Sequence, residues 1–339
     1  MEWILLAIFA GICNGTFAFP MKFTSKWRWE NIWGLFSLWG FVVFPILLGL
    51  MTVPHLFKIF QVVGLQKLFL IFIFGFLWGI GSICFGLGIR YIGIGMAFSL
   101  NIGLTIAIGS LLPLFQGMLN SDSDQRNAMI VLFGILIIII GVIINGHAAF
   151  LREKQISKDE NISKLTKKSR KVAFKGIVLC IVAGLMSPML QIAFMLGRDI
   201  VIVAKEMGIS TTMATNAIWM VALFGGFVIT IVYTTILLTR NKTWELYKIT
   251  EAKNYHLYAI IMGLLWTVTI ASYGIAVGNM GELGLSIGWA IFNSVGIICA
   301  NLLGILTKEW QNAHKKIIYV MAGGLFFLVM GTCIVGMAQ

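Results

Sequence analysis

Charged residues are what this sequence lacks most. Asp, Glu, Lys and Arg make up 11% of its 339 residues, whereas soluble domains carry about 25%. Hydrophobic residues account for 59%. These proportions exclude an ordinary soluble domain and predict an all-α polytopic membrane protein, in which the core forms where helix packs against helix.

The sequence also lacks the common motifs of enzymes and of nucleotide-driven pumps. It contains no phosphate-binding Gly-Lys-Ser or Gly-Lys-Thr loop and no HExxH. Its five cysteines lie in apolar runs without CxxC spacing, which indicates neither a metal site nor a disulfide framework. We therefore expect no enzymatic activity, no metal and no cofactor, so an ion gradient must drive any transport.

Ten apolar segments are each long enough for the ~20 residues that a helix needs to cross a membrane. The first begins with an acid and lacks the basic region of a signal peptide, so we count it as a span. The ten segments lie at about residues 3–21, 31–53, 68–89, 93–118, 127–149, 173–197, 211–239, 255–278, 283–306 and 317–338.

The distribution of Lys and Arg predicts how the chain is oriented. With ten spans both termini lie on one side, and 20 of the 25 basic residues fall in loops on the opposite side. The positive-inside rule then places both termini outside and the basic loop 150–172 in the cytoplasm. The net charge of +12 is thus a topology signal and predicts no nucleic-acid partner.

The same loop divides the sequence into two five-helix halves, residues 1–149 and 173–339. Shifting the chain by 188 positions aligns Gly75, Leu77, Trp78, Gly86 and Gly93 with Gly263, Leu265, Trp266, Gly274 and Gly281. Five is an odd number of helices, so homologous halves must insert in opposite orientations. This is the 5+5 inverted repeat of many secondary transporters.

Polar side chains inside apolar spans are candidate substrate contacts, because each one costs free energy in the membrane. Asn14 lies in the first span and Asn101 in the fourth, while Gln191 follows Pro188, which is expected to kink the sixth span. A structural role in packing or in interhelical hydrogen bonds is the open alternative at each position.

Tryptophans and amides point to the class of substrate. Trp289 and Asn293 are four residues apart and share one face of the ninth span. Together with Trp78 and Trp266 they provide aromatic faces and neutral amides, which bind the CH faces and hydroxyls of sugars. Interface belts and helix packing are the alternatives for tryptophan. We predict that Trp289→Ala or Asn293→Ala lowers uptake and leaves expression intact.

Few ionisable residues lie near the spans. Proton coupling requires a half-buried carboxyl, and Glu282 is the first candidate and Asp199 the second. Lys22 and Arg90 are candidates for gating, with snorkelling to the membrane interface as the alternative. All four histidines lie at loop or helix ends, which does not favour a histidine proton relay.

Three strings resemble the L-rhamnose/proton symporter (RhaT-like) family of the drug/metabolite transporter superfamily. They are KWRWENIW at 26–33, FLWGIGSICFGLGIRYIGIGM at 76–96, and KEW followed by Asn312 at 308–312. The resemblance covers nearly the whole chain. It implies a ten-helix 5+5 inverted repeat, a central cavity that works by alternating access, and import of a deoxysugar with a proton or a sodium ion.

The sequence departs from that family where the ninth span begins. The rhamnose carriers have a more polar stretch here, whereas this chain reads GELGLSIGW, so another monosaccharide is an open alternative. The resulting hypothesis is a sugar importer, monomeric or homodimeric, in the lipid bilayer of a bacterial inner membrane. An exporter of small polar metabolites or drugs on the same fold is the main alternative, and a receptor or scaffold without transport activity is the third.

Overall fold

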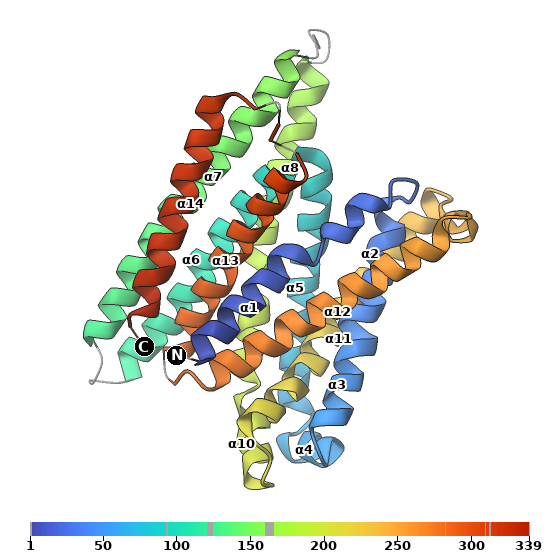
Figure 1. The fold of residues 1–339 in the computed structure, drawn as a ribbon. Coiled ribbons are helices and arrows are strands. Elements are labelled where there is room, and N and C mark those ends of the chain that lie inside the picture. The colour runs from blue at the N-terminus through green and yellow to red at the C-terminus, as the bar shows by residue number, and fades with distance from the viewer. Residues whose placement is uncertain are drawn as a thin grey trace. The chain divides into compact units, whose positions relative to one another are not determined.

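A computed structural model describes residues 2–92, 94–120, 125–159, 166–281, 283–308, 310–311 and 313–338. The secondary structure over these ranges is helical, and they include no strand. Figure 1 shows the helices along the chain. The predicted all-α membrane class agrees with this architecture.

Nine stretches among the described residues are long and apolar enough to cross a membrane. Their limits lie within three residues of nine of the ten predicted spans, except that the sixth ends at Glu206 and not at residue 197. The agreement arises because hydrophobic length directly determines where a helix can cross. The nine stretches are Glu2–Phe23, Trp29–Thr52, Leu65–Ile89, Arg126–Arg152, Phe174–Glu206, Thr211–Arg240, Ala252–Gly278, Gly284–Leu306 and Lys315–Gly336.

The remaining predicted span, 93–118, corresponds to helix α6 (Ile94–Asn120). Within the described side chains of this helix, the apolar segment Leu100–Leu112 is shorter than a membrane crossing. Two further short helices, α4 (Leu56–Val63) and α10 (Arg198–Glu206), were not predicted from the sequence. They follow the second span and end the sixth.

The chain folds into two compact units, and each unit takes helices from both halves of the sequence. Unit 1 is Met1–Ile80 with Met189–Asn279, and unit 2 is Gly81–Pro188 with Met280–Gln339. Helix α5 (Leu65–Ile92) therefore begins in unit 1 and ends in unit 2. The predicted division at residues 150–172 separates two halves that are each continuous in the sequence, unlike the two compact units. It remains a prediction.

Unit 1 contains the elements that carry most of the tryptophans. Helix α1 packs along α12, and α2 and α3 pack against α11 and α12 (Figure 1). The unit comprises α1 (Glu2–Thr16), η1 (Phe19–Phe23), α2 (Trp29–Leu38), η2 (Trp39–Val43), α3 (Phe44–Thr52), α4, α9 (Met189–Leu196), α10, α11 (Thr211–Arg240), η3 (Trp244–Lys248), α12 (Ala252–Gly278) and the first part of α5.

Element η2 is one turn of π-helix between α2 and α3. Pro45 follows it in the first turn of α3. Proline has no backbone N–H to donate and clashes with the preceding turn, so the α-helical hydrogen-bond pattern must change before it. The turn places Gly40 against Gly263 of α12, because a Cβ on Gly40 would lie 3.1 Å from the Gly263 Cα.

Small residues let α5 and α11 approach closely in unit 1. Gly75 and Gly79 on α5 meet Ala222 and Gly226 on α11, in a small-xxx-small arrangement on both helices. A Cβ built on Gly75 would lie 1.8 Å from the carbonyl oxygen of Ala222. Lipid provides no hydrophobic drive for association, so close packing of this kind holds membrane helices together.

Unit 2 is built around the pair α7 and α14, which lie side by side in Figure 1. Gly134 and Gly141 of α7 pack against the backbone at Gly331 and Gly324 of α14, with hypothetical Cβ distances of about 3 Å. The unit comprises α6, α7 (Gln125–Asp159), α8 (Thr166–Met186), α13 (Gly284–Leu306), α14 (Lys315–Gly336) and the second part of α5.

Helices occupy much of the predicted basic loop. Helix α7 continues to Asp159, and α8 begins at Thr166. Lys, Arg, Glu and Gln are good helix formers. These polar residues therefore end the apolar span without ending the helix. At 35 residues, α7 is about 50 Å long, which is longer than the ~30 Å hydrocarbon core.

The predicted break beside Pro188 is confirmed. Helix α8 ends at Met186 and α9 begins at Met189, and Ser187 and Pro188 form a turn between them. Because proline cannot donate to the preceding turn, the last α-helical backbone bond before it is that of Ser187 to the Ala183 carbonyl, at 2.7 Å.

Candidate functional site

Two stacked tryptophans form the centre of an aromatic cluster in unit 1. Trp78 of α5 and Trp266 of α12 lie 5.6 Å apart between ring centroids, with an interplanar angle of 14°. Phe17 contacts Trp266 at 5.1 Å, and Phe41 of η2 contacts Trp78 at 5.0 Å. The two tryptophans that the internal repeat aligned are therefore direct neighbours.

The indole N–H of Trp266 has no hydrogen-bond partner among the described residues. The side chain is 8% exposed and that of Trp78 is 7% exposed. A buried donor that lacks an acceptor costs about 1–3 kcal/mol, so an acceptor on a bound molecule would stabilise it. The N–H groups of Trp29, Trp33 and Trp219 share this property, but only Trp266 combines it with the repeat-related stack.

A second polar contact in unit 1 joins Gln191 of α9 to Tyr273 of α12. The Tyr273 hydroxyl donates to the Gln191 side-chain oxygen, and Gln191 is 1% exposed. Phe194 and Trp219 stack beside them at 4.8 Å. Gln191 is thus a buried amide with an interhelical hydrogen bond, which is the structural alternative that the sequence left open.

Asn14 lies half-buried on α1, three residues before the Phe17 of the aromatic cluster. Helix α1 packs along α12, the helix that carries Trp266. Asn14 is therefore placed on an element that borders the stacked pair.

Unit 2 contains the remaining candidates for substrate binding. The Trp289 N–H of α13 donates to the Thr105 carbonyl oxygen of α6 at 2.9 Å. The ring also covers Gly109, where a Cβ would lie 2.2 Å from the indole nitrogen. At 4% exposure, Trp289 joins α13 to α6.

Two amides flank this contact. The Asn293 side chain donates to the Trp289 carbonyl oxygen one turn earlier at 2.9 Å, and it is 4% exposed. Asn101 is 6% exposed and accepts a hydrogen bond from the Ser187 hydroxyl of the break before α9, at 3.1 Å. Asn101, Trp289 and Asn293 therefore lie in one unit, on α6 and α13.

The predicted ionisable residues are placed very differently. Asp199 on α10 is partly exposed and forms an ion pair with Lys67 of α5 rather than with its neighbour Arg198. Lys22 lies over the Phe19 ring at 5.5 Å. Glu282 lies outside the described residues, and Arg90 lies in the last turn of α5 with a side chain that is also outside the description.

Sequence reasoning missed Glu30, in the first turn of α2. It follows two tryptophans in the string WRWEN, and its side chain is fully buried. The string is charged and follows a basic loop, which is typical of a solvated surface. The only inference that the sequence supports for this string is therefore the resemblance to the family. The sequence feature that could have identified Glu30 is an acidic residue close to tryptophans.

The whole chain matches a family model described as L-rhamnose-proton symport protein (RhaT), over residues 1–339. The chain belongs to this family. Proteins named L-rhamnose-proton symporter are its relatives along almost the entire length. The Escherichia coli relative is 25% identical over 99% of this chain and 96% of its own. The Pectobacterium atrosepticum relative is 26% identical over 99% and 98%, and that of Yersinia pestis 25% identical over 99% and 96%.

Membership of the RhaT family agrees with the resemblance seen in the sequence and identifies a transporter family rather than an enzyme family. The name of the family specifies sugar and proton, and the apolar helices specify a multi-pass membrane protein. The individual site residues are not identified by this match. For this member of the RhaT family they remain predictions.

Asn293 offers a direct test with a matched control on the same helix. Asn301 makes the same contact one turn back, donating to the Ile297 carbonyl oxygen at 3.0 Å. If Asn293 binds substrate, Asn293→Ala should lower uptake about tenfold, the equivalent of one hydrogen bond of ~1.4 kcal/mol, while Asn301→Ala should leave it unchanged. Equal uptake by both variants and the parent would limit Asn293 to a structural role.

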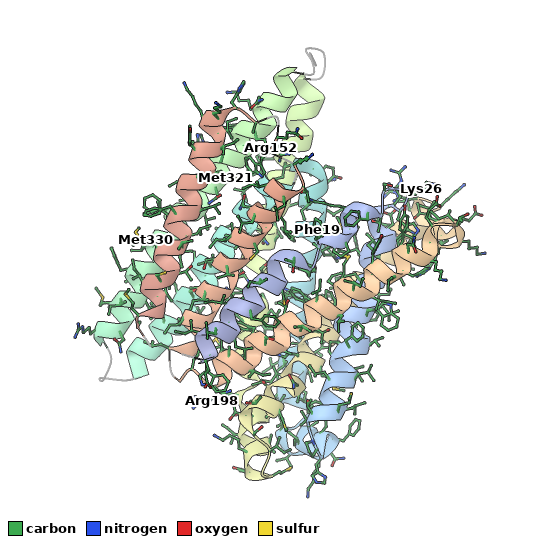
Figure 2. All side chains as sticks on the ribbon, in the orientation of Figure 1. Phe19, Lys26, Arg152, Arg198, Met321 and Met330 are labelled. Carbon is green, nitrogen blue, oxygen red and sulfur yellow. The ribbon has the colours of Figure 1, made fainter. Side chains whose placement is uncertain are left out.

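An exposed ion pair in unit 1 predicts a weak dependence of stability on pH. Figure 2 labels Lys26 near the start of α12, where it pairs with Glu251. The hydrogen bond from Lys26 lowers the pKa of Glu251 below its ordinary 4.5, and the bond to Glu251 raises the pKa of Lys26 above 10.5. The contribution of the ion pair to stability is complete between pH 4.5 and pH 10.5, the ordinary pKa values of the two groups. It is lost as the pH falls through the lowered pKa or rises through the raised one.

Both partners are exposed, so the pair should contribute little. We expect Glu251→Gln to lower the melting temperature slightly at neutral pH in dilute salt, and not at all in concentrated salt, where exposed charges are screened. Thermal melts of the purified protein in the two buffers measure this. A decrease that persists in concentrated salt would mean that Glu251 acts through something other than the ion pair.

Proposed function

We propose that this protein imports L-rhamnose, or a closely related monosaccharide, together with a proton across a bacterial inner membrane. The observation that carries the proposal is the match to the L-rhamnose-proton symport family over the entire chain, with curated relatives of that name covered almost completely. A membrane potential of 100 mV provides ~2.3 kcal/mol per proton, which supports about fiftyfold accumulation.

In this proposal the stacked pair Trp78 and Trp266 provides an apolar platform for the CH face of the sugar. The orphan N–H of Trp266 donates to a sugar oxygen. Neutral amides complete the binding of hydroxyls, because they exchange donors and acceptors with a sugar without burying a charge. The amides in unit 1 are Asn14 and Gln191. In unit 2, Asn101, Trp289 and Asn293 remain separate sequence-based candidates for binding substrate.

The proposed architecture has ten crossings in two inverted halves. Helix α6 is the fourth crossing, α2 with α3 forms the second, and α8 with α9 forms the sixth. The termini lie outside, and the sugar reaches each side in turn by alternating access, with Lys22 and Arg90 at the entrances. Glu282 and Asp199 remain the sequence-based predictions for the proton-carrying acid.

Uptake of radiolabelled L-rhamnose into proteoliposomes tests the function. The purified protein should accumulate L-rhamnose when the outside is made acidic, and a protonophore should abolish accumulation. Replacing the proton gradient by a sodium gradient should not restore it. A parallel set with L-fucose, L-arabinose and D-glucose establishes the range of monosaccharides.

Failure to accumulate any sugar under a proton gradient would contradict the proposal. Efflux of preloaded small polar metabolites, or resistance to a drug in expressing cells, would then support the exporter alternative. Accumulation of a sugar other than L-rhamnose would keep proton symport and correct the substrate.

A further inference from the structure

Glu30 is the only fully buried acid among those whose side chains the structure describes. It is the second residue of α2, and its side chain has 0% exposure. The other described acidic side chains, Glu2, Asp199, Glu206, Glu245 and Glu251, are all partly or largely exposed. Burying a carboxylate is costly unless it is paired and fully hydrogen-bonded, so its retention here needs an explanation.

The two oxygens of Glu30 have unequal environments. Oε1 accepts a hydrogen bond from the Asn241 amide at 2.7 Å and another from the Thr243 hydroxyl at 3.2 Å. Oε2 is buried and has no hydrogen-bond partner among the described residues. Both donors are neutral, and no described cation forms an ion pair with Glu30. A proton can therefore bind to Oε2 without displacing an existing hydrogen-bond donor.

The contacts of Glu30 hold the segment 241–248 on the start of α2. The Asn31 side chain donates to the Thr243 carbonyl oxygen at 2.9 Å, and the Tyr247 hydroxyl donates to the Asn31 carbonyl oxygen at 3.0 Å. The Trp27 indole donates to the Leu246 carbonyl oxygen at 2.8 Å. We call residues 241–248 the clasp. It follows the end of α11, includes η3 and covers Glu30.

The ionisable groups on the elements around Glu30 do not neutralise it directly. Burial raises the pKa of Tyr247 to about 12, so this hydroxyl keeps its hydrogen near neutral pH. His256 packs its ring against Trp27 and Tyr247, and Tyr233 meets the edge of Trp29. The basic side chains at this end of α2, α11 and η3 are exposed, and they are Arg28, Arg240, Lys242 and Lys248.

We propose that Glu30 is the carboxyl that takes up and releases the coupled proton. The inference rests on the proposed function, since it assigns a carrier for the proton of symport. The carboxylate accepts one proton from water on the side of uptake and returns it to water on the side of release, with no other bond made or broken. Buried acids in membrane proteins characteristically serve as such relays.

The same contacts link the proton to the conformation of unit 1. Hydrogen bonds to a carboxylate are roughly twice as strong as those between neutral groups. Protonation of Glu30 therefore weakens its hold on Asn241 and Thr243, and so loosens the clasp from α2. The clasp lies between α11 and α12 in the chain. The charge on Glu30 therefore influences the conformation of both of these helices.

The first test reads the carboxyl itself and needs no substrate. Infrared difference spectra of the reconstituted parent protein, recorded as the pH is lowered, should contain the C=O band of a buried carboxylic acid. Glu30→Gln preserves size and the acceptor at Oε1 and should remove this band. Glu245→Gln, an exposed acid of the clasp, is the matched control and should retain it. A spectrum unchanged by Glu30→Gln would overturn the inference.

The second test separates coupling from sugar recognition. In proteoliposomes, L-rhamnose should drive proton uptake by the parent and by Glu245→Gln, while Glu30→Gln should lose at least tenfold of this uptake and retain sugar counterflow, which needs no net proton movement. Sugar-driven proton uptake by Glu30→Gln at the parent's rate would overturn the inference, and so would loss of coupling only in Glu282→Gln or Asp199→Asn.

The two tests also distinguish this inference from the proposed function. If the parent transports no sugar, the proposed function fails, and the infrared titration alone decides the role of Glu30. If Glu30→Gln does not fold, Glu30→Asp keeps the acid on a shorter stem. This variant should retain a carboxylic acid band at a shifted frequency and part of the coupling. An unaltered band in Glu30→Asp would overturn the inference.

Discussion

Replacing Gly75 by alanine should prevent most of the protein from folding. A Cβ at this position would lie 1.8 Å from the Ala222 carbonyl oxygen and 2.9 Å from its Cα. These are backbone atoms of α11, so no side chain can rotate away, and α5 and α11 must separate. Overpacking usually costs about 1–3 kcal/mol. A contact between two backbones lies at the upper end of that range or beyond it.

The matched control is Gly323→Ala on α14, where a Cβ meets no atom within 4 Å. Alanine is the better helix former by roughly 0.8–1.0 kcal/mol, so this variant should be as stable as the parent or slightly more so. Size-exclusion profiles and thermal melts in detergent measure both variants. A Gly75→Ala protein that elutes and melts like the parent would show that α5 and α11 are not in close contact.

Loss of sugar uptake by Trp266→Ala is the second large expected effect. The change removes one ring of the stack with Trp78, at 5.6 Å, and also the orphan N–H. Stacking and one hydrogen bond together contribute more than about 1.4 kcal/mol, so we expect uptake to fall more than tenfold. Initial rates of L-rhamnose uptake, normalised to folded protein, measure the effect.

Two further variants assign that loss to its cause. Trp266→Phe keeps an aromatic ring and removes only the N–H, so its uptake should lie between that of the parent and that of Trp266→Ala. Trp244→Ala removes a tryptophan that is 48% exposed and should transport normally. Normal uptake by folded Trp266→Ala would exclude the stacked pair from the sugar site.

The stacked tryptophans show how far sequence reasoning reached toward the site. The repeat aligned Trp78 with Trp266 and suggested that both serve one function. That they touch each other is a property of the packing of α5 and α12 in unit 1, and no spacing in the sequence specifies it. Trp289 differs from Trp266, because its indole N–H has a hydrogen-bond partner. That partner is the Thr105 carbonyl oxygen, 184 positions away along the chain.

Glu30 shows why some functional candidates escape a reading of the sequence. Its string, WRWEN, resembles a charged loop entering a helix. It is buried because the clasp covers it, and the Asn241 side chain that reaches its oxygen is 211 positions away along the chain. Asp199 is the reverse case, because an acid near an apolar span proves to be partly exposed and paired with Lys67.

The sequence by itself determined the membrane class, the family resemblance and the limits of most of the membrane-crossing stretches. Hydrophobicity accumulates residue by residue, and ~20 apolar residues in a row suffice to specify a crossing. Only the tertiary structure decided which polar groups are buried and which of them lack partners. The reason is that solvent exclusion and hydrogen bonding at Glu30, Trp266 and Trp289 depend on residues remote in the chain.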